Sequence, residues 1–321
     1  RPALILPEFE RTKGETSPLK PQLFTYAEDP LSRTETFEAA ARQLGLLGRR
    51  VGVEPLRLRV FELRLLESAA QGAQFVSAEE LITSVRVAKD EAEVASMRRA
   101  VRVAESALEA TLPLLKLGMT EREAAAELTV QLLRAGSDSE LPFPPIVASG
   151  PNSALPHAVP SDRRLQAGDL VVVDWGATVD GYISDLTRTL AIGTVDPELV
   201  NVHAIVLEAT RAGVAAVRPG VPAAEVDRAA RAVIEAAGYG EYFTHRTGHG
   251  LGMDVHEDPY IREGNAKPLE VGNVFTVEPG VYLAGVGGVR IEDDVLITEN
   301  GAESLSTFPR RSATTSPGSR A

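Results

Sequence analysis

Cysteine is absent from the 321 residues of this chain. Disulfide bridges, thiolate zinc sites and a cysteine nucleophile are therefore excluded. The absence is consistent with a cytoplasmic protein, because stable disulfides are rare in that compartment. No uninterrupted apolar run approaches the roughly 18 residues that a membrane-spanning helix needs, so we expect no membrane segment. The chain begins at Arg1 rather than at methionine, and we expect it to start inside a longer gene product.

Positive charge is the minority charge, with 33 Lys and Arg against 45 Asp and Glu and a net charge of −12 with histidine neutral. A protein that binds nucleic acid needs a basic face for the phosphates, so this balance disfavours that function. A solvated acidic surface is the simplest explanation of the excess of acidic residues. Some of the carboxylates could instead be gathered around a metal. The length and the 44% hydrophobic and 24% charged residues indicate a globular protein of about two domains.

The first part of the chain, residues 1–85, differs in character from the rest. It alternates short apolar runs with proline-rich and charged turns. Residues 51–54 are typical of a strand entering a turn, and residues 57–70 have helical spacing of apolar side chains. These patterns predict a small α/β unit, in which we find no cluster of catalytic residue types.

Beyond residue 86 two helices are predicted in succession. Residues 90–116 carry apolar side chains at helical spacing along one face. Thr120 and Glu123 have the spacing of a capping box, which predicts the start of a second helix. That helix is expected to end at Gly136, because a glycine often terminates a helix in the left-handed conformation.

An internal repeat is the strongest organisational signal. Gly118 and Gly136 match Gly220 and Gly238, each 102 residues later, and residues 168–176 match residues 272–280 at an offset of 104. Each copy is expected to contain two helices and then a buried strand that ends in a carboxylate and a turn glycine. Two copies predict one α+β domain of two related halves with a cleft between them, rather than an open solenoid.

Each half carries two carboxylates on a predicted β-hairpin. In the first half, Asp174 ends the apolar strand 170–173, and Asp185 follows a turn at residues 179–182. In the second half, Glu278 occupies the position equivalent to Asp174, and Glu292 follows a glycine-rich turn at residues 285–288. A lone acid at a strand end usually belongs to a turn or cap, but two at matched positions after apolar strands argue for a shared site. Unpaired carboxylates so close repel each other, unless a divalent cation lies between them.

His249 lies between the two hairpins, and flanking glycines leave its imidazole open. Alone, it could equally be structural. Four carboxylates and one imidazole, without sulfur, suit a dinuclear centre for Mn²⁺, Co²⁺, Zn²⁺ or Fe²⁺. Two such ions can share a water that loses its proton near neutral pH and becomes a nucleophile.

Six motifs match one known family: Asp174-Trp-Gly-Ala, Ser184-Asp-Leu-Thr-Arg-Thr, Thr247-Gly-His-Gly-Leu-Gly, His256-Glu-Asp-Pro, Val277-Glu-Pro-Gly-Val-Tyr and Gly288-Val-Arg-Ile-Glu-Asp. Over residues 86–309 the chain resembles the pita-bread metallopeptidases, which include Xaa-Pro aminopeptidase, prolidase and methionine aminopeptidase. The resemblance implies an α+β pita-bread fold for this region. Residues 1–85 resemble part of the creatinase-type N-terminal domain of the proline-specific members, without its beginning. Residues 310–321, rich in Ser, Thr, Pro and Gly, are predicted to be a disordered tail.

The resemblance also implies a metal-binding role for each of five residues. Asp174 would bind one ion, Asp185 and Glu292 would bridge both, and His249 and Glu278 would hold the second. Glu278 would also shuttle a proton between the attacking water and the leaving nitrogen.

Four further residues match substrate-facing positions of the family. His157 precedes the first acid, and His256 would contact the scissile carbonyl and help to stabilise the tetrahedral intermediate. Both could also be loop histidines without a task. His245 and Arg290 match positions near the proline end of the substrate, where Arg290 would either hold a free proline carboxylate or brace the site. His203 is expected to be structural, in a helix at residues 201–217.

The implied activity is that of a metal-dependent exopeptidase, an Xaa-Pro aminopeptidase, acting through a hydroxide bridged by two divalent ions. Mn²⁺ is favoured, with Co²⁺ or Zn²⁺ as alternatives. Xaa-Pro dipeptidase (prolidase) is the alternative activity. Residues 1–85 and His245 argue against methionine aminopeptidase, and the intact ligand set argues against a non-catalytic peptidase-like binding protein. The expected partners are short peptides with proline in the second position, and the family implies a cytoplasmic homodimer.

Overall fold

The computed structural model describes residues 1–310 and the backbone of residues 314–315. The chain divides into two compact units, Arg1–Val85 and Arg86–Ala321. Most of the predicted disordered tail, residues 310–321, lies outside the described residues. Within it, Arg310 forms an ion pair with Asp293, and strand β17 (Thr314–Thr315) pairs in parallel with β9 (Leu186–Ile192).

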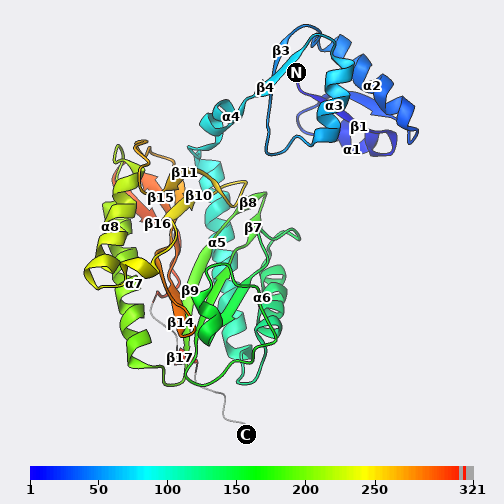
Figure 1. Ribbon diagram of the computed structural model, residues 1–321. Helices are drawn as coiled ribbons and strands as arrows, with labels where there is room; N and C mark the ends of the chain where they lie inside the picture. The colour runs from blue at the N-terminus through cyan, green and yellow to red at the C-terminus, as the bar shows by residue number, and fades with distance from the viewer. Residues whose placement is uncertain (311–313, 316–321) are drawn as a thin grey trace. The chain divides into compact units, whose positions relative to one another are not determined.

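The N-terminal unit is built on two parallel strand pairs (Figure 1). Strand β1 (Ala3–Pro7) pairs with β2 (Gln22–Tyr26), and β3 (Arg50–Val53) pairs with β4 (Gln74–Ser77). The helices are η1 (Glu8–Glu10), α1 (Arg11–Glu15), α2 (Pro30–Gln43), α3 (Val60–Ala69) and α4 (Glu79–Arg86), which runs into the second unit. The predicted strand and helix are confirmed as β3 and α3, although α3 begins at Val60 rather than at residue 57.

Two helices open the first half of the second unit. Both α5 (Glu91–Thr111) and α6 (Glu121–Ala135) begin with capping boxes, and α6 ends at Gly136, whose φ is 105°. The predicted capping box and terminal glycine of α6 are therefore confirmed. The first helix ends earlier than predicted, because Pro113 in the following turn η2 (Leu112–Leu114) has no N–H with which to continue the helix.

The strands of the first half form one sheet and one small hairpin. They are β5 (Ile146–Ser149), β6 (Leu170–Trp175), β7 (Thr178–Val179), β8 (Tyr182–Ile183) and β9, and the short helix η3 (Gly150–Ala154) follows β5. The sheet has the order β17-β9-β6-β5, and β7 pairs separately with β8. The face of α5 that packs beneath it is fully buried at Met97, Val101, Ala104 and Leu108.

The second half repeats this plan of two helices followed by strands. Its elements are α7 (Pro197–Ala216), α8 (Ala223–Ala236), η4 (Gly240–Tyr242), β10 (Gly248–Gly250), β11 (Glu257–Ile261), β12 (Val274–Val277), β13 (Gly280–Leu283), β14 (Gly287–Arg290), β15 (Asp293–Thr298) and β16 (Gly301–Ser304). The main sheet has the order β11-β10-β12-β15-β16. Figure 1 shows α5 and α6 on one side of the strands of this unit and α7 and α8 on the other.

The repeat predicted from the sequence is also present in the backbone. The equivalent glycines Gly118 and Gly220 have φ values of 82° and 81°, and Gly168 and Gly272 have 95° and 87°. Glycine adopts these left-handed conformations without steric cost. The matching glycines therefore mark the same turns in both halves.

Both predicted hairpins are present, with one correction. Between β7 and β8, Asp180 and Gly181 have φ values of 53° and 76°, as a two-residue hairpin turn requires. In the second half the turn lies at residues 284–286, so the predicted turn at residues 285–288 is wrong at its end. Gly288 belongs to β14 instead, where a Cβ would lie 2.2 Å from the Ser153 carbonyl oxygen. This glycine serves close packing rather than a turn.

Helix α7 is long and apolar enough, by length and composition alone, to cross a membrane. The exposed Glu208 and Arg211 interrupt its apolar sequence. Val202, Val206 and Ala209 are fully buried in a core shared with other parts of the second unit. This pattern is typical of a core helix. The helix begins at Pro197, before the predicted residue 201, because proline fits the first helical turn after an Asp196 cap.

Glu121, the first residue of α6, is fully buried and holds the loop that follows β5. Its carboxylate accepts hydrogen bonds of 2.7–3.2 Å from the N–H and hydroxyl groups of Ser149 and Ser161 and from the Asn152 amide. Burial alone would raise the pKa of Glu121, but these hydrogen bonds outweigh burial and lower the pKa. The same loop carries His157.

Replacing Glu121 with glutamine is expected to lower the free energy of unfolding by about 1–3 kcal/mol, because the amide would direct an N–H at hydrogen-bond donors and leave buried groups unpaired. Urea denaturation measures this change. The matched control is Glu109→Gln on the exposed face of α5, which should change the free energy by less than about 0.5 kcal/mol. Equal losses in both variants would contradict the assignment.

Candidate metal centre

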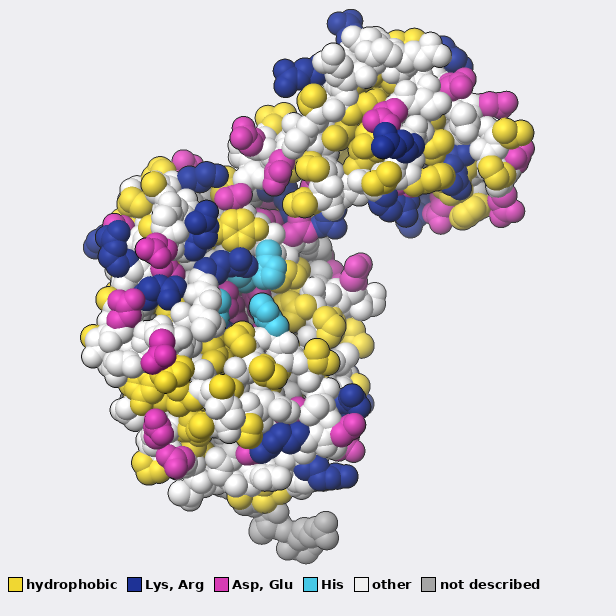
Figure 2. Space-filling model, in the orientation of Figure 1, with side chains coloured by type: hydrophobic (Ala, Val, Ile, Leu, Met, Phe, Trp, Pro, Cys, Tyr) yellow, Lys and Arg dark blue, Asp and Glu magenta, His cyan; other side chains and the backbone are white. Residues whose placement is uncertain are grey.

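A cavity of about 710 Å³ lies between the two halves of the second unit, with residues of both halves in its walls. The predicted cleft is therefore present. Figure 2 shows a hollow on this unit where histidine side chains gather beside acidic and basic ones. His157 and His256 are the exposed histidines that line the cavity.

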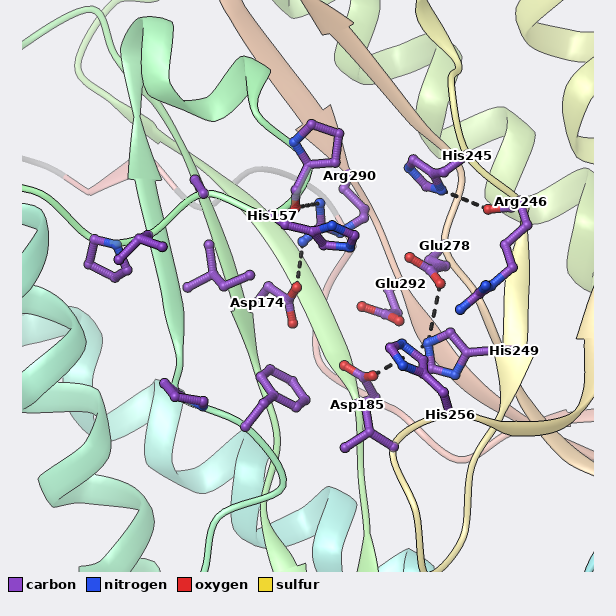
Figure 3. A pocket seen from close by; sticks show the side chains of 18 of the residues that line it. His157, Asp174, Asp185, His245, Arg246, His249, His256, Glu278, Arg290 and Glu292 are labelled. Carbon is purple, nitrogen blue, oxygen red and sulfur yellow. Dashed lines mark hydrogen bonds and ion pairs between the residues drawn. The ribbon is translucent and has the colours of Figure 1, made fainter. Parts of the chain in front are cut away.

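Four carboxylates and one imidazole converge in this cavity (Figure 3). They come from strands or strand ends: Asp174 in β6, Asp185 before β9, His249 in β10, Glu278 after β12 and Glu292 before β15. Asp185, His249 and Glu292 each offer one ligand atom within 4.8 Å of the other two. His249 Nε2 lies 3.7 Å from Asp185 Oδ2 and 3.4 Å from Glu278 Oε1. The structure thus brings all five predicted metal ligands into one cavity, three of them in a close cluster.

The strand that carries His249 requires glycine on both sides of the histidine. A Cβ on Gly248 would lie 1.8 Å from the Thr276 carbonyl oxygen, and a Cβ on Gly250 would lie 2.1 Å from that of Asp258. His249 Nδ1 is 3.1 Å from the Gly250 carbonyl oxygen. A carbonyl only accepts hydrogen bonds, so Nδ1 carries the proton and Nε2 presents a lone pair to the carboxylates.

Burial opposes ionisation throughout this cluster. The pKa of Asp185 lies well above its ordinary value because the carboxyl is buried and faces Glu292 and Asp174. Burial, together with Glu278 and Asp174, also raises the pKa of Glu292 well above its ordinary value. Burial raises the pKa of Glu278 to about 7 and lowers the pKa of His249 to about 3, so the imidazole is neutral at physiological pH. Acids that cannot all ionise unaided, around a neutral imidazole nitrogen, are a donor set that fits divalent cations.

Arg290 is buried beside Asp174. Its Nη2 donates to Asp174 Oδ2 at 2.5 Å, and its other bonds run to Thr187 Oγ1 (3.1 Å), the Pro156 carbonyl (3.0 Å) and Tyr282 Oη (3.0 Å). Four of the five N–H groups of this guanidinium therefore donate to the protein. Asp174 Oδ1 is buried and has no hydrogen-bond partner among the described residues, which leaves it available to an ion.

Tyr282 connects Arg290 to His245. The Tyr282 hydroxyl accepts from Arg290 and donates to His245 Nε2 at 2.8 Å, while His245 Nδ1 donates to the Arg246 carbonyl at 2.7 Å. Burial lowers the pKa of His245 to about 4, so the ring is neutral. Both nitrogens of His245 are hydrogen-bonded to the protein. A ligand in the cavity would therefore contact the carbon atoms of the ring rather than its nitrogens.

The remaining histidines differ in their surroundings. The His256 ring packs edge-on against the His249 ring, with centroids 4.2 Å apart. Burial, with the charge of Arg246, lowers the pKa of His256. His157 lies in the loop after η3. His203 is buried in α7 and is not among the residues that line the cavity.

Several residues at the site have no role in the sequence interpretation. Arg246 and Arg262 line the cavity, and Thr187 Oγ1 donates to Glu292 Oε2 at 2.6 Å. Thr187 and Tyr282 lie inside motifs that match the family, and Arg246 is next to His245. Proximity to these motifs was the only feature of the sequence that could have pointed to the three residues. Their contacts depend on the tertiary fold and could not be read from spacing.

Comparisons with known proteins agree with this geometry. The profile of metallopeptidase family M24 matches residues 95–299. A Xaa-Pro dipeptidase of Pyrococcus horikoshii is 42% identical over 245 residues, which cover 76% of this chain and 70% of that protein. Among solved structures, an X-Pro aminopeptidase of Thermotoga maritima has a TM-score of 0.88 at 35% identity, covering 97% of this chain and 87% of the other. A prolidase of Thermococcus sibiricus has a TM-score of 0.91 at 35% identity, covering 97% and 84%.

These matches extend over both halves of the second unit and include the strands that carry the five converging side chains. The chain therefore belongs to metallopeptidase family M24, with the pita-bread fold and among its proline-specific members.

Proposed function

We propose that this protein is a metal-dependent exopeptidase that hydrolyses the bond between an N-terminal residue and a following proline. The observation that carries the proposal is the convergence of four carboxylates and one neutral imidazole in a cavity at the protein surface. Relatives named Xaa-Pro dipeptidase, X-Pro aminopeptidase and prolidase support the substrate class.

Five residues would hold two divalent ions: Asp174, Asp185, His249, Glu278 and Glu292. The oxygen-rich donor set with a single nitrogen favours Mn²⁺, with Co²⁺ or Zn²⁺ as alternatives. When bound, such a pair supplies a water of lowered pKa and an electrophile for the scissile carbonyl.

The protein's own groups would move the protons and orient the peptide. The carboxylate of Glu278, which lines the cavity, would take a proton from the attacking water and return it to the leaving nitrogen. His256 would donate to the scissile carbonyl oxygen as negative charge develops on it. His157, on the opposite wall of the cavity, would hold the substrate.

Recognition of proline must rely on shape, because the imide nitrogen carries no hydrogen. The first-half wall supplies the apolar side chains Phe143, Ile146 and Val159, and the second half supplies the ring of His245. Arg290 would brace Asp174 rather than bind substrate, since most of its N–H groups are already used.

Xaa-Pro dipeptidase activity is the second candidate, and the positions of Arg246 and Arg262 in the cavity wall favour it. A dipeptide presents a free carboxylate directly on the proline, and a guanidinium binds a carboxylate well. A longer peptide has an uncharged amide at that point. The two activities therefore differ in whether these arginines have a charged partner in the substrate.

We further infer that residues 1–85 are part of a creatinase-type N-terminal domain and that residues 86–309 form the catalytic domain. Membership of the family supports both, together with a homodimeric, cytoplasmic protein. The net charge of −12 supports peptides rather than nucleic acids as partners.

A panel of peptides tests the function. With Mn²⁺ added, Ala-Pro-Ala should be cleaved after the first residue, and Ala-Ala-Ala should be cleaved about 100-fold less efficiently, because the pocket is shaped for the proline ring. Product analysis by mass spectrometry gives kcat/KM for each peptide. Faster turnover of Ala-Pro than of Ala-Pro-Ala would establish the dipeptidase instead. Preferential cleavage of Met-Ala-Ser, or no cleavage of any peptide, would contradict the proposal.

Asp185→Asn is expected to lower both Mn²⁺ affinity and kcat/KM by about 100-fold or more. Loss of a hydrogen bond to a metal ligand commonly costs about 10- to 100-fold, and loss of the ligand itself should cost more. Isothermal titration calorimetry and peptide turnover measure the two quantities. Asp180→Asn makes the same chemical change at the exposed β7–β8 turn, and it should leave both unchanged. Retention of metal and full turnover by Asp185→Asn would disprove the assignment.

The stability of the metal-free protein should depend on pH in a defined direction. The folded-state pKa of Glu278 is raised from 4.5 to about 7, so its contribution to stability is complete below the unfolded pKa and is lost as pH rises through about 7. Above about pH 6.5 the histidines of the site, whose folded-state pKa values are lowered, are neutral in both the folded and the unfolded state. We therefore expect the Tm of the metal-free protein to fall between about pH 6.5 and about pH 8, and the rise in Tm on adding Mn²⁺ to be larger at the higher pH, because binding requires ionised acids. Scanning fluorimetry with and without Mn²⁺ measures both, and a larger metal effect at the lower pH would refute this assignment.

A further inference from the structure

Arg188, in β9, is 2% exposed, and the proposed reaction does not use it. Its five N–H groups donate to five acceptors: the carbonyl oxygens of Glu292 (2.5 Å), Thr187 (2.9 Å), Phe308 (2.8 Å) and Pro309 (3.2 Å), and Asp293 Oδ1 (2.8 Å). One guanidinium thus joins a first-half strand, a second-half strand and the segment that follows β16. We refer to residues 306–310 of that segment as the C-terminal clasp.

The clasp is also anchored to helix α5. Glu105, buried on that helix, accepts from the Phe308 N–H at 2.6 Å, from the Thr307 hydroxyl at 2.9 Å and from the Thr307 N–H. The Phe308 ring packs edge-on against Trp175, with centroids 6.4 Å apart and an interplanar angle of 80°. Trp175 directly follows Asp174 in β6. The clasp therefore packs beside the strand segment that presents the first acid.

Asp293 ties the clasp to the second half. Its side chain is fully buried, and it accepts from Arg188, from the Ser306 hydroxyl at 2.9 Å and from Arg310. Asp293 directly follows Glu292 and begins β15. The buried Arg188–Asp293 ion pair therefore joins β9 to β15 directly beside Glu292.

Three hydrogen bonds from this arrangement fix Glu292. Its N–H donates to the Thr187 carbonyl at 3.1 Å, its carbonyl accepts from Arg188, and its carboxylate accepts from the Thr187 hydroxyl at 2.6 Å. Hydrogen bonds that fix a metal ligand from outside commonly change metal affinity by about 10- to 100-fold. Arg188 is placed to have such an effect because it contacts the backbone of Glu292 while leaving the carboxylate free.

We propose that the C-terminal clasp, held by Arg188, positions Glu292 and Asp174 for metal binding. This rests on the proposed metal centre. Arg188 is a positioning residue, because it acts through Glu292 and is not among the residues that line the cavity. The clasp contacts both halves, and so it would set the separation between the first-half and second-half acids.

The test measures Mn²⁺ binding to the metal-free, full-length protein by isothermal titration calorimetry. Arg188→Lys keeps a positive charge opposite Asp293 but cannot form five bonds in a planar fork. Its Kd for Mn²⁺ should rise about tenfold or more. Glu105→Gln, which weakens the far anchor of the clasp on α5, should raise the Kd in the same direction by a smaller factor.

Leu132→Ala is the control for a general loss of stability. Leu132 is fully buried in the core beneath the first-half sheet, and its truncation should lower Tm while leaving the Kd for Mn²⁺ unchanged. An unchanged Kd in Arg188→Lys, or an equal rise in Leu132→Ala, would overturn the clasp proposal. If Arg188→Lys does not fold, an unchanged Kd in Glu105→Gln overturns it. Absence of Mn²⁺ binding by the unaltered protein would instead overturn the proposed function.

Discussion

The crowding of four largely buried acidic side chains into one cavity is the constraint on which the rest of this molecule depends. Burial and mutual repulsion raise the pKa of Asp185 and Glu292 well above the ordinary range, so the cluster is costly without a compensating cation. Such a cluster persists only if the surrounding structure holds it in place. The two halves do this by presenting each acid on a strand or at a strand end, where hydrogen bonds to neighbouring strands limit movement.

Much of the centre could be predicted because its signals are local and occur twice. Asp174 and Glu278 each follow a run of apolar residues at equivalent positions of the repeat, and this coincidence distinguishes them from ordinary turn residues. The capping box at Thr120 and the left-handed glycine at Gly136 similarly define α6 by short-range chemistry. Such features depend on a few neighbouring residues, so the sequence contains nearly all the information needed to find them.

The features that escaped prediction depend on residues distant in sequence. Whether Arg290 braces the site or faces the substrate depends on Thr187, Pro156 and Tyr282, which approach it only in the folded protein. The glycine at position 288 resembles a turn residue in the sequence, yet it lies in β14, where Ser153 packs too close to allow a Cβ. In the sequence, Arg188 is simply a basic residue in a predicted strand. Four of its five hydrogen-bond acceptors lie more than 100 residues away, so its role could not be predicted.

The glycines around His249 have a consequence for how this protein could diversify. Because even a single added methyl at Gly248 or Gly250 would overlap a neighbouring carbonyl, the strand that carries the imidazole tolerates almost no change in volume. The loops that bear His157 and Arg262 are more open to solvent. New substrate preferences could therefore evolve through those loops, while the inorganic chemistry beneath them stays the same.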